Sequence, residues 1–224
     1  IKADGNITQA GVKDINYSYH KKTKKGFMGL TSKSVTDENY AEKAILSATL
    51  AGDKGLTYDS KNNLLLEGVK VVSSGSINLK GNNIENTGAD IKAQDKIEIG
   101  AKKNLVIGNL EAIDKKVNDG GRDFVLDEKR TNVGSNLNAK DISLTSLGDI
   151  GISGSNIVAT NKASIQAKGD ISIVAGKDSV LHKEKHSKSK GFGRSESSTD
   201  IKYDEKLVPT QIIGKDVDIV SEKN

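Results

Sequence analysis

Residues 62–108 read NNLLLEGVKVVSSGSINLKGNNIENTGADIKAQDKIEIGAKKNLVIG, and this stretch repeats itself with a period of about 20 residues, which is typical of a repeat architecture. The glycines and the asparagine pairs keep this spacing: Gly68, Gly88, Gly108, Asn62-Asn63 and Asn82-Asn83. Further along the chain, Gly148-Asp149-Ile150 returns as Gly169-Asp170-Ile171 after a slightly longer interval. A short regular period of this kind indicates that each unit stacks on the next.

Apolar and polar residues alternate within each period, as in the segments 77–79 and 97–99. Alternation predicts short strands with one buried face. The corners between them are rich in Gly and Asn, which tolerate positive φ. Each strand would pair with the equivalent strand of the next coil. The sequence therefore predicts an all-β fold, a parallel β-helix with about 20–21 residues per coil and corners that carry either an asparagine ladder or simple asparagine turns.

The composition agrees with a narrow solenoid. Aromatic residues make up only 4% of the chain, whereas stacked Ile, Val and Leu can fill a thin core. The absence of cysteine excludes a disulfide framework and thiol catalysis. The net charge of +4 comes from 34 basic and 30 acidic residues, so we expect no nucleic-acid binding. No apolar run approaches the length of a transmembrane helix.

Three polar excursions interrupt the coils at about residues 16–44, 111–131 and 182–206. They lack inward apolar positions, so we expect them to project as loops or β-hairpins, and residues 31–36 have the β propensity of a hairpin arm. The coil segments between them resemble one another. We therefore expect residues 1–224 to be a single β-helix repeat region cut from a longer chain.

Basic runs precede a Gly-Phe pair in the first and third excursions, at Gly26-Phe27 and Gly191-Phe192. Basic residues on a rigid scaffold can contact anionic glycans, acidic headgroups or a target-cell surface. The alternative is a solvated loop whose sequence matters little. The candidate surface-binding residues are Lys21, Lys22, Lys24, Lys25, Lys183, Lys185, Lys188 and Lys190.

The segment 134–193 contains GSNLNAKDISL, AGKDS and HSKSKGFG, and it resembles the haemagglutinin repeats of filamentous-haemagglutinin-type exoproteins. That family includes two-partner-secreted adhesins, haemolysin-like exoproteins and effectors of contact-dependent growth inhibition. The resemblance implies a right-handed β-helix in a long, rod-shaped virulence protein. It also implies a protein that is secreted or associated with the outer membrane at the bacterial surface, with an outer-membrane transporter as partner.

Few residues suggest catalysis or metal binding. His182 and His186 are four residues apart with Glu184 between them, but neighbouring lysines would repel a cation, so exposed polar residues are the simpler interpretation. Asp149 and Asp170 lie one coil apart, as catalytic carboxylates of a polysaccharide-active β-helix could, but aspartates in turns commonly bond backbone amides. We expect no catalytic residue, metal or cofactor.

The sequence thus favours a noncatalytic rod-like segment of a secreted or surface-exposed bacterial adhesin, which mediates extension and cell-surface adhesion. One alternative is a stalk or delivery segment of a growth-inhibition toxin or haemolysin-like exoprotein. Another is a polysaccharide-active enzyme. The receptor and the oligomeric state stay open.

Overall fold

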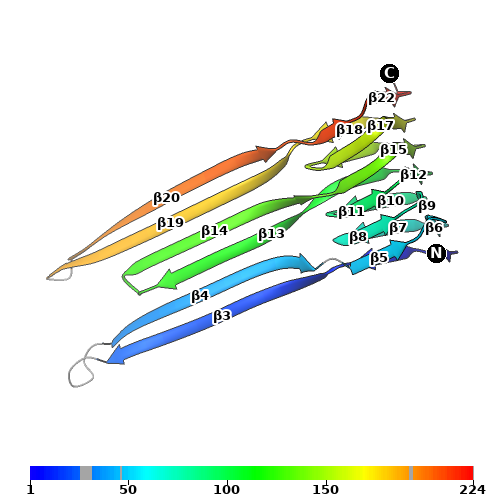
Figure 1. Cartoon of the computed structure of the whole chain (residues 1–224). Helices are drawn as coiled ribbons and strands as arrows, with labels where there is room; N and C mark the ends of the chain where they lie inside the picture. The colour runs from blue at the N-terminus through cyan, green and yellow to red at the C-terminus, as the bar shows by residue number, and fades with distance from the viewer. Residues whose placement is uncertain (26–31, 46, 192–193, 224) are drawn as a thin grey trace.

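The computed structural model describes residues 1–25, 32–45, 47–191 and 194–223, and within them every regular element is a β-strand. Short parallel strands stack coil on coil, and three long hairpins, here called arms, project side by side from the stack (Figure 1). The predicted all-β parallel β-helix with projecting hairpins is confirmed.

The stack has three faces of parallel strands, and strand pairing joins the first two of them into one sheet. The first face contains β1 (Lys2–Ala3), β6 (Leu56–Ser60), β9 (Ile77–Gly81), β12 (Lys96–Ala101), the second halves of β15 (Asn136–Ser146) and β17 (Asn156–Ala167), and β22 (Asp216–Ser221). The second contains β5 (Ser47–Ala51), β8 (Val69–Ser73), β11 (Asp90–Ala93), the first halves of β15 and β17, and β21 (Gln211–Ile213). The third contains β2 (Ile7–Ala10), β7 (Asn63–Glu67), β10 (Asn83–Thr87), the start of β13 (Leu105–Asp119), β16 (Ile150–Ser153) and β18 (Ile171–Val174).

The pairing register confirms the coil length. Ile84 lies beside Leu64 of the preceding coil and beside Leu105 of the following coil, as the predicted period requires. Equivalent residues therefore meet along the stack, about 4.8 Å apart. The inward-facing members of each strand form aliphatic columns, and Ile77, Ile97 and Ile142 make one column that is at most 1% exposed.

At the corner between the third and second faces, some coils make a tight turn and others extend into an arm. Gly68, Gly88 and Gly154 stand at this corner with φ of 53°, 58° and 51°, and the chain turns there directly into the second face. Gly108 instead lies inside β13, and the chain continues straight into an arm. The regular glycine spacing thus marks one corner, but the glycine there has two different roles.

Side chains form a ladder at the corner where the third face begins. The Asn63 Oδ1 accepts a hydrogen bond from Asn83 Nδ2 at 2.9 Å, which favours the ladder over simple turns. Asn83 and Asn104 each accept a backbone N–H from the next coil. Asp149 accepts the backbone N–H of Asp170 at 2.8 Å, so its carboxylate holds two coils together.

Alanine at Gly154 should destabilise the protein. A Cβ there would lie 2.9 Å from Gly176 Cα, and L-residues lose about 1–2 kcal/mol in the left-handed conformation. Gly151 lies in the same coil with open space around its Cβ position, so Gly151→Ala is the matched control. Denaturant unfolding should show a loss of about 2 kcal/mol or more for Gly154→Ala and a change within about 0.5 kcal/mol for the control. Equal losses of stability in the two variants would contradict the left-handed corner conformation assigned to Gly154.

Leucine at Asn86 should stabilise the protein. Asn86 is fully buried in a column between Leu66 and Ile107, and neither its Oδ1 nor its Nδ2 has a hydrogen-bond partner among the described residues. An unsatisfied buried amide costs about 1–3 kcal/mol, and leucine has a similar size. Asn86→Leu should therefore raise the free energy of unfolding, whereas Leu66→Asn in the same column should lower it. A destabilised Asn86→Leu variant would show that the amide has a favourable partner.

Candidate functional site

The three arms form one six-stranded antiparallel sheet, here called the arm sheet. Its hairpins are β3 (Val12–Lys25) with β4 (Ser32–Ile45), β13 with β14 (Asp123–Gly134), and β19 (Gly176–Gly191) with β20 (Arg194–Val208). Neighbouring arms also pair with each other, because β4 pairs with β13 and β14 pairs with β19. The excursions are therefore ordered strands that cross-link coils far apart in the sequence.

Arm spacing follows from strand spacing. An arm is two strands wide, so neighbouring arms fit when they leave the stack two coils apart. The second and third arms do so, because β13, β16 and β18 are successive strands of the third face. The first and second arms leave three coils apart, across β2, β7, β10 and β13. A groove of about 330 Å³ lies at the base of these two arms, lined in part by Lys13, Glu42, Glu67 and Gly68.

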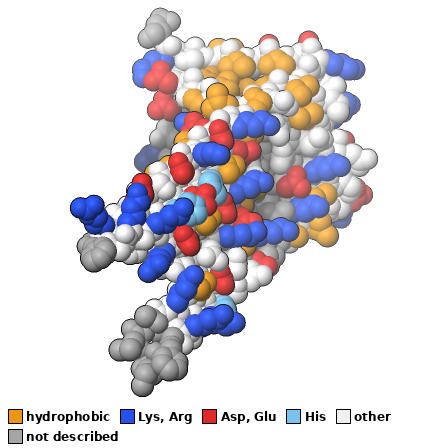
Figure 2. All heavy atoms as spheres, turned by 90° about the vertical axis from the view of Figure 1, so that its left-hand side faces the viewer, with side chains coloured by type: hydrophobic (Ala, Val, Ile, Leu, Met, Phe, Trp, Pro, Cys, Tyr) orange, Lys and Arg blue, Asp and Glu red, His pale blue; other side chains and the backbone are white. Residues whose placement is uncertain are grey.

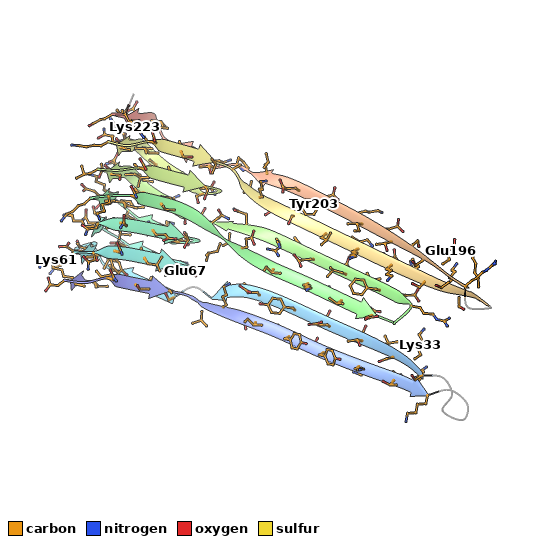
Figure 3. The ribbon with its side chains drawn as sticks, turned by 180° about the vertical axis from the view of Figure 1, so that it is seen from behind. Lys33, Lys61, Glu67, Glu196, Tyr203 and Lys223 are labelled. Carbon is orange, nitrogen blue, oxygen red and sulfur yellow. The ribbon has the colours of Figure 1, made fainter. Side chains whose placement is uncertain are left out.

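Residues directly opposite each other in paired strands share a face, so each row can be followed across the whole arm sheet. The rows show that the two faces of the sheet carry different kinds of side chain. One face, here called the tyrosine face, carries the row Tyr17, Tyr40, Lys115, Glu128, Leu181 and Tyr203. The opposite face, here called the charged face, carries the next row, Ser18, Asn39, Lys116, Asp127, His182 and Lys202. Tyr203 is seen along the third arm in Figure 3.

Strand alternation divides the predicted surface-binding lysines between these faces. Lys21, Lys183 and Lys185 lie in rows of the tyrosine face, whereas Lys22, Lys24 and Lys188 lie in rows of the charged face. Lys190 forms an ion pair with Glu196 at 2.5 Å near the third tip. The first-arm and third-arm lysines are on separate hairpins, so the structure does not gather all eight into one site. Gly26-Phe27, Phe192 and Thr31 lie outside the described residues.

The tips of the first two arms form a basic cluster, here called the tip cluster. Lys24, Lys25, Lys33 and Arg122 line a cavity of about 580 Å³ together with Gly120 and Gly121. Figure 2 looks onto the tips and shows Lys and Arg side chains over this end of the arm sheet. Sequence reasoning missed Lys33 and Arg122, because the β3–β4 hairpin register brings Lys33 to the basic run and pairing of the first two arms brings Arg122 there.

The tip cluster has an excess of positive charge. Lys24 lies directly opposite Lys33, and like charges in opposite positions repel. Among the described residues, no carboxylate lies within 4 Å of the four cationic side chains of the cluster. Residues 26–31 contain no Asp or Glu. This arrangement is suited to a multiply charged anion.

Two histidines join the second and third arms on the charged face. His182 Nδ1 lies 2.7 Å from Asp127 Oδ1, and His186 Nδ1 lies 3.1 Å from Asp123 Oδ1. Glu184 lies between them, with its Oε1 2.7 Å from His186 Nε2. The two histidines share a face because they are four residues apart on a strand, not a helix. The described residues contain no group of three or more His, Cys, Asp or Glu side chains arranged to hold a metal ion.

The pKa of His186 should lie above its usual value of 6.5. The hydrogen bond to the Asp123 carboxylate raises this pKa most, and the charge of Glu184 adds to the effect. Because the pKa of His186 is raised in the folded state, the interaction of protonated His186 with these carboxylates stabilises the fold fully below pH 6.5. This stabilisation is lost as the pH rises through the folded-state pKa. An NMR titration should show the raised pKa, and Asp123→Asn should lower it. Asp127→Asn, which removes the partner of His182, is the control. A His186 pKa that Asp123→Asn leaves unchanged would contradict the assignment.

A comparison with known protein families gives one match, which lies in the second and third arms. Residues 119–203 match the model of the hemagglutinin repeat family, from the end of β13 to the middle of β20. The match includes the junction between the second and third arms. No curated protein and no solved structure matches the chain. This part of the chain is thus similar to a hemagglutinin repeat of the filamentous-haemagglutinin type.

Proposed function

We propose that this chain is a noncatalytic, rod-like segment of a large bacterial adhesin, secreted or held at the cell surface. The similarity to a hemagglutinin repeat supports a filamentous-haemagglutinin-like adhesin segment. Export through an outer-membrane transporter, which the resemblance implies, is part of the same proposal. The stacked coils supply length, and the arms supply a surface beside the rod. Among the described residues, no helix is long and apolar enough to cross a membrane.

The contact surface in this proposal is the distal end of the arm sheet, and its ligand is an anionic glycan of the target cell. The observation that supports it is the tip cluster, in which four cations surround one cavity without a neighbouring carboxylate among the described residues. A sulfated or carboxylated sugar would relieve the repulsion between Lys24 and Lys33. The remaining predicted lysines Lys21, Lys22, Lys183, Lys185, Lys188 and Lys190 would extend the positive surface around this site.

An enzymatic role has less support. Asp149 accepts the backbone amide of Asp170, and Asp170 Oδ2 lies 2.5 Å from Lys223 Nζ. Both carboxylates therefore have structural partners at a corner of the stack.

Charge reversal tests whether the tip cluster, rather than the general surface charge, binds the glycan. The variant Lys24→Glu, Lys25→Glu, Lys33→Glu and Arg122→Glu should bind an immobilised sulfated glycan at least about tenfold more weakly than the native chain. The control variant reverses four exposed lysines on the coil stack: Lys70, Lys80, Lys92 and Lys102. Both variants change the net charge equally, so only the tip variant should lose binding. Native binding should also fall as salt rises.

Equal losses in the two variants would contradict this site and would indicate nonspecific attraction. Unchanged binding by the tip variant at low salt would exclude the tip cluster. Circular dichroism and thermal unfolding of both variants show that the fold is retained.

A further inference from the structure

The tyrosine face of the arm sheet is apolar at its centre. Four neighbouring rows, here called the central rows, cross all six strands and begin on β3 at Ile15, Tyr17, Tyr19 and Lys21. The three rows of the charged face that lie between them contain only small apolar residues, at Ala41, Val125 and Val180. The apolar and aromatic side chains of the central rows are Ile15, Tyr17, Tyr19, Tyr40, Ile113, Val117, Phe124, Leu126, Leu181, Ile201 and Tyr203.

This apolar surface is open to solvent even on the inner strands of the sheet. Tyr40, Val117, Leu126 and Leu181 lie on β4, β13, β14 and β19, each of which has a strand neighbour on both sides, yet all four side chains are only half-buried. Figure 1 shows the arms as a single layer beside the stack. A contiguous exposed apolar patch with charged residues around it is typical of an interaction surface.

The size and flatness of the central rows suit a second copy of the same face. Six strands about 4.8 Å apart and four rows about 6.8 Å apart cover about 800 Å². That is about the area that each partner contributes to a stable protein–protein interface. A flat, apolar sheet face is covered best by another sheet face, which packs on it about 10 Å away with nearly aligned strands.

We propose that two copies of this chain form a dimer by packing their tyrosine faces against each other. The two-fold axis runs across the strands, between the second and third central rows. The row of Tyr17 then faces the row of Tyr19 of the other copy, and the row of Ile15 faces the row of Lys21. The interface is isologous, so the assembly closes as a dimer. The tip cluster lies outside the central rows, so the dimer does not depend on glycan binding.

The length of the arms fits this arrangement. The axis crosses β3 at Ser18, which is six residues from the base of the arm at Val12 and seven from Lys25. The arm tips of each copy therefore reach the level of the arm bases of the other copy. The two coil stacks lie on opposite sides of the interface, and the two rods run in nearly the same direction.

The charged side chains of the two outer central rows complement each other. In each row their signs alternate along the sheet, and the two rows are offset by one strand. The first row carries them on β4, β14 and β20, at Glu42, Arg130 and Glu205. The fourth row carries them on β3, β13 and β19, at Lys21, Asp119 and Lys185.

The crossing angle of packed sheets corrects this offset. Packed sheets cross at about −30°, and the outer rows lie about 10 Å from the axis, so the crossing shifts them by about 5 Å, or one strand. The direction of the shift follows from the hand of the sheet. Gly120 N–H donates to Asp123 O, so with the tips upward and the tyrosine face toward the viewer, β14 lies to the left of β13.

With this hand, each charged residue of the fourth row moves over an opposite charge of the first row of the other copy. A crossing of the opposite sign would place like charges together. Each unlike pair forms twice in the dimer because of the two-fold symmetry. The pairs are Lys21 with Glu42, Asp119 with Arg130, and Lys185 with Glu205.

Sedimentation equilibrium of the full 224-residue chain tests the dimer. The dimer fraction should rise with protein concentration. Leu181→Lys removes an apolar contact of the tyrosine face and brings a second cation near Lys183 of the other copy, so it should weaken the dimer at least about tenfold. Val180→Lys, one residue away on the charged face, is the matched control and should leave the dimer unchanged. Circular dichroism checks that both variants keep the fold.

A charge swap tests the two-fold arrangement. Lys185→Glu and Glu205→Lys should each weaken the dimer at least about fivefold, and the double variant should return to within about twofold of the native dimer. Lys185 and Glu205 lie about 20 Å apart within one chain, three rows from each other, so the rescue requires contact between copies.

Three results would overturn the proposal. One is a monomer at all concentrations, which would show that the tyrosine face does not bind a second copy. Another is an equal effect of Leu181→Lys and Val180→Lys, which would place association elsewhere. The third is a double variant no better than the single ones, which would exclude the proposed pairing of the rows.

Discussion

In-register parallel stacking at one strand spacing is the constraint on which this molecule depends. Each inward residue meets its equivalent one coil away, so the core is a set of columns and tolerates little variation in coil length. The arms obey the same spacing, because a two-stranded hairpin occupies the height of two coils. Where the chain provides two coils between arms, they fit; where it provides three, the groove near Glu42 and Glu67 opens at their base.

The coil repeat could be predicted from the sequence because its signals are local. Alternating apolar residues and recurrent Gly and Asn corners define strands, faces and period without knowledge of distant contacts. The sequence did not distinguish Gly108 from Gly68 and Gly88, because the difference lies in whether the following residues turn into the second face or continue into β13. The sequence likewise did not reveal the buried Asn86 amide, which has no hydrogen-bond partner among the described residues, because Asn86 lies in a strand with regular alternation.

The arm sheet could be predicted only in outline. Polar excursions without apolar columns indicate projecting hairpins, but pairing between hairpins joins residues 49 to 83 positions apart. His182 with Asp127 and His186 with Asp123 are two such pairs. The lysine runs were visible, yet strand alternation sends successive lysines to opposite faces. Arg122 completes the tip cluster from another arm, so no local pattern could include it.

The shared spacing of arms and coils has a mechanical consequence. Separation of the coils along the rod axis would break hydrogen bonds in the stack and, between the first and third arms, the β4–β13 and β14–β19 pairs as well. The arms act as a rib along one side, so the rod should resist bending in the plane of the arm sheet more than across it. Under tension, coils that the arms do not cross-link would separate before the coils that the β4–β13 and β14–β19 pairs hold together.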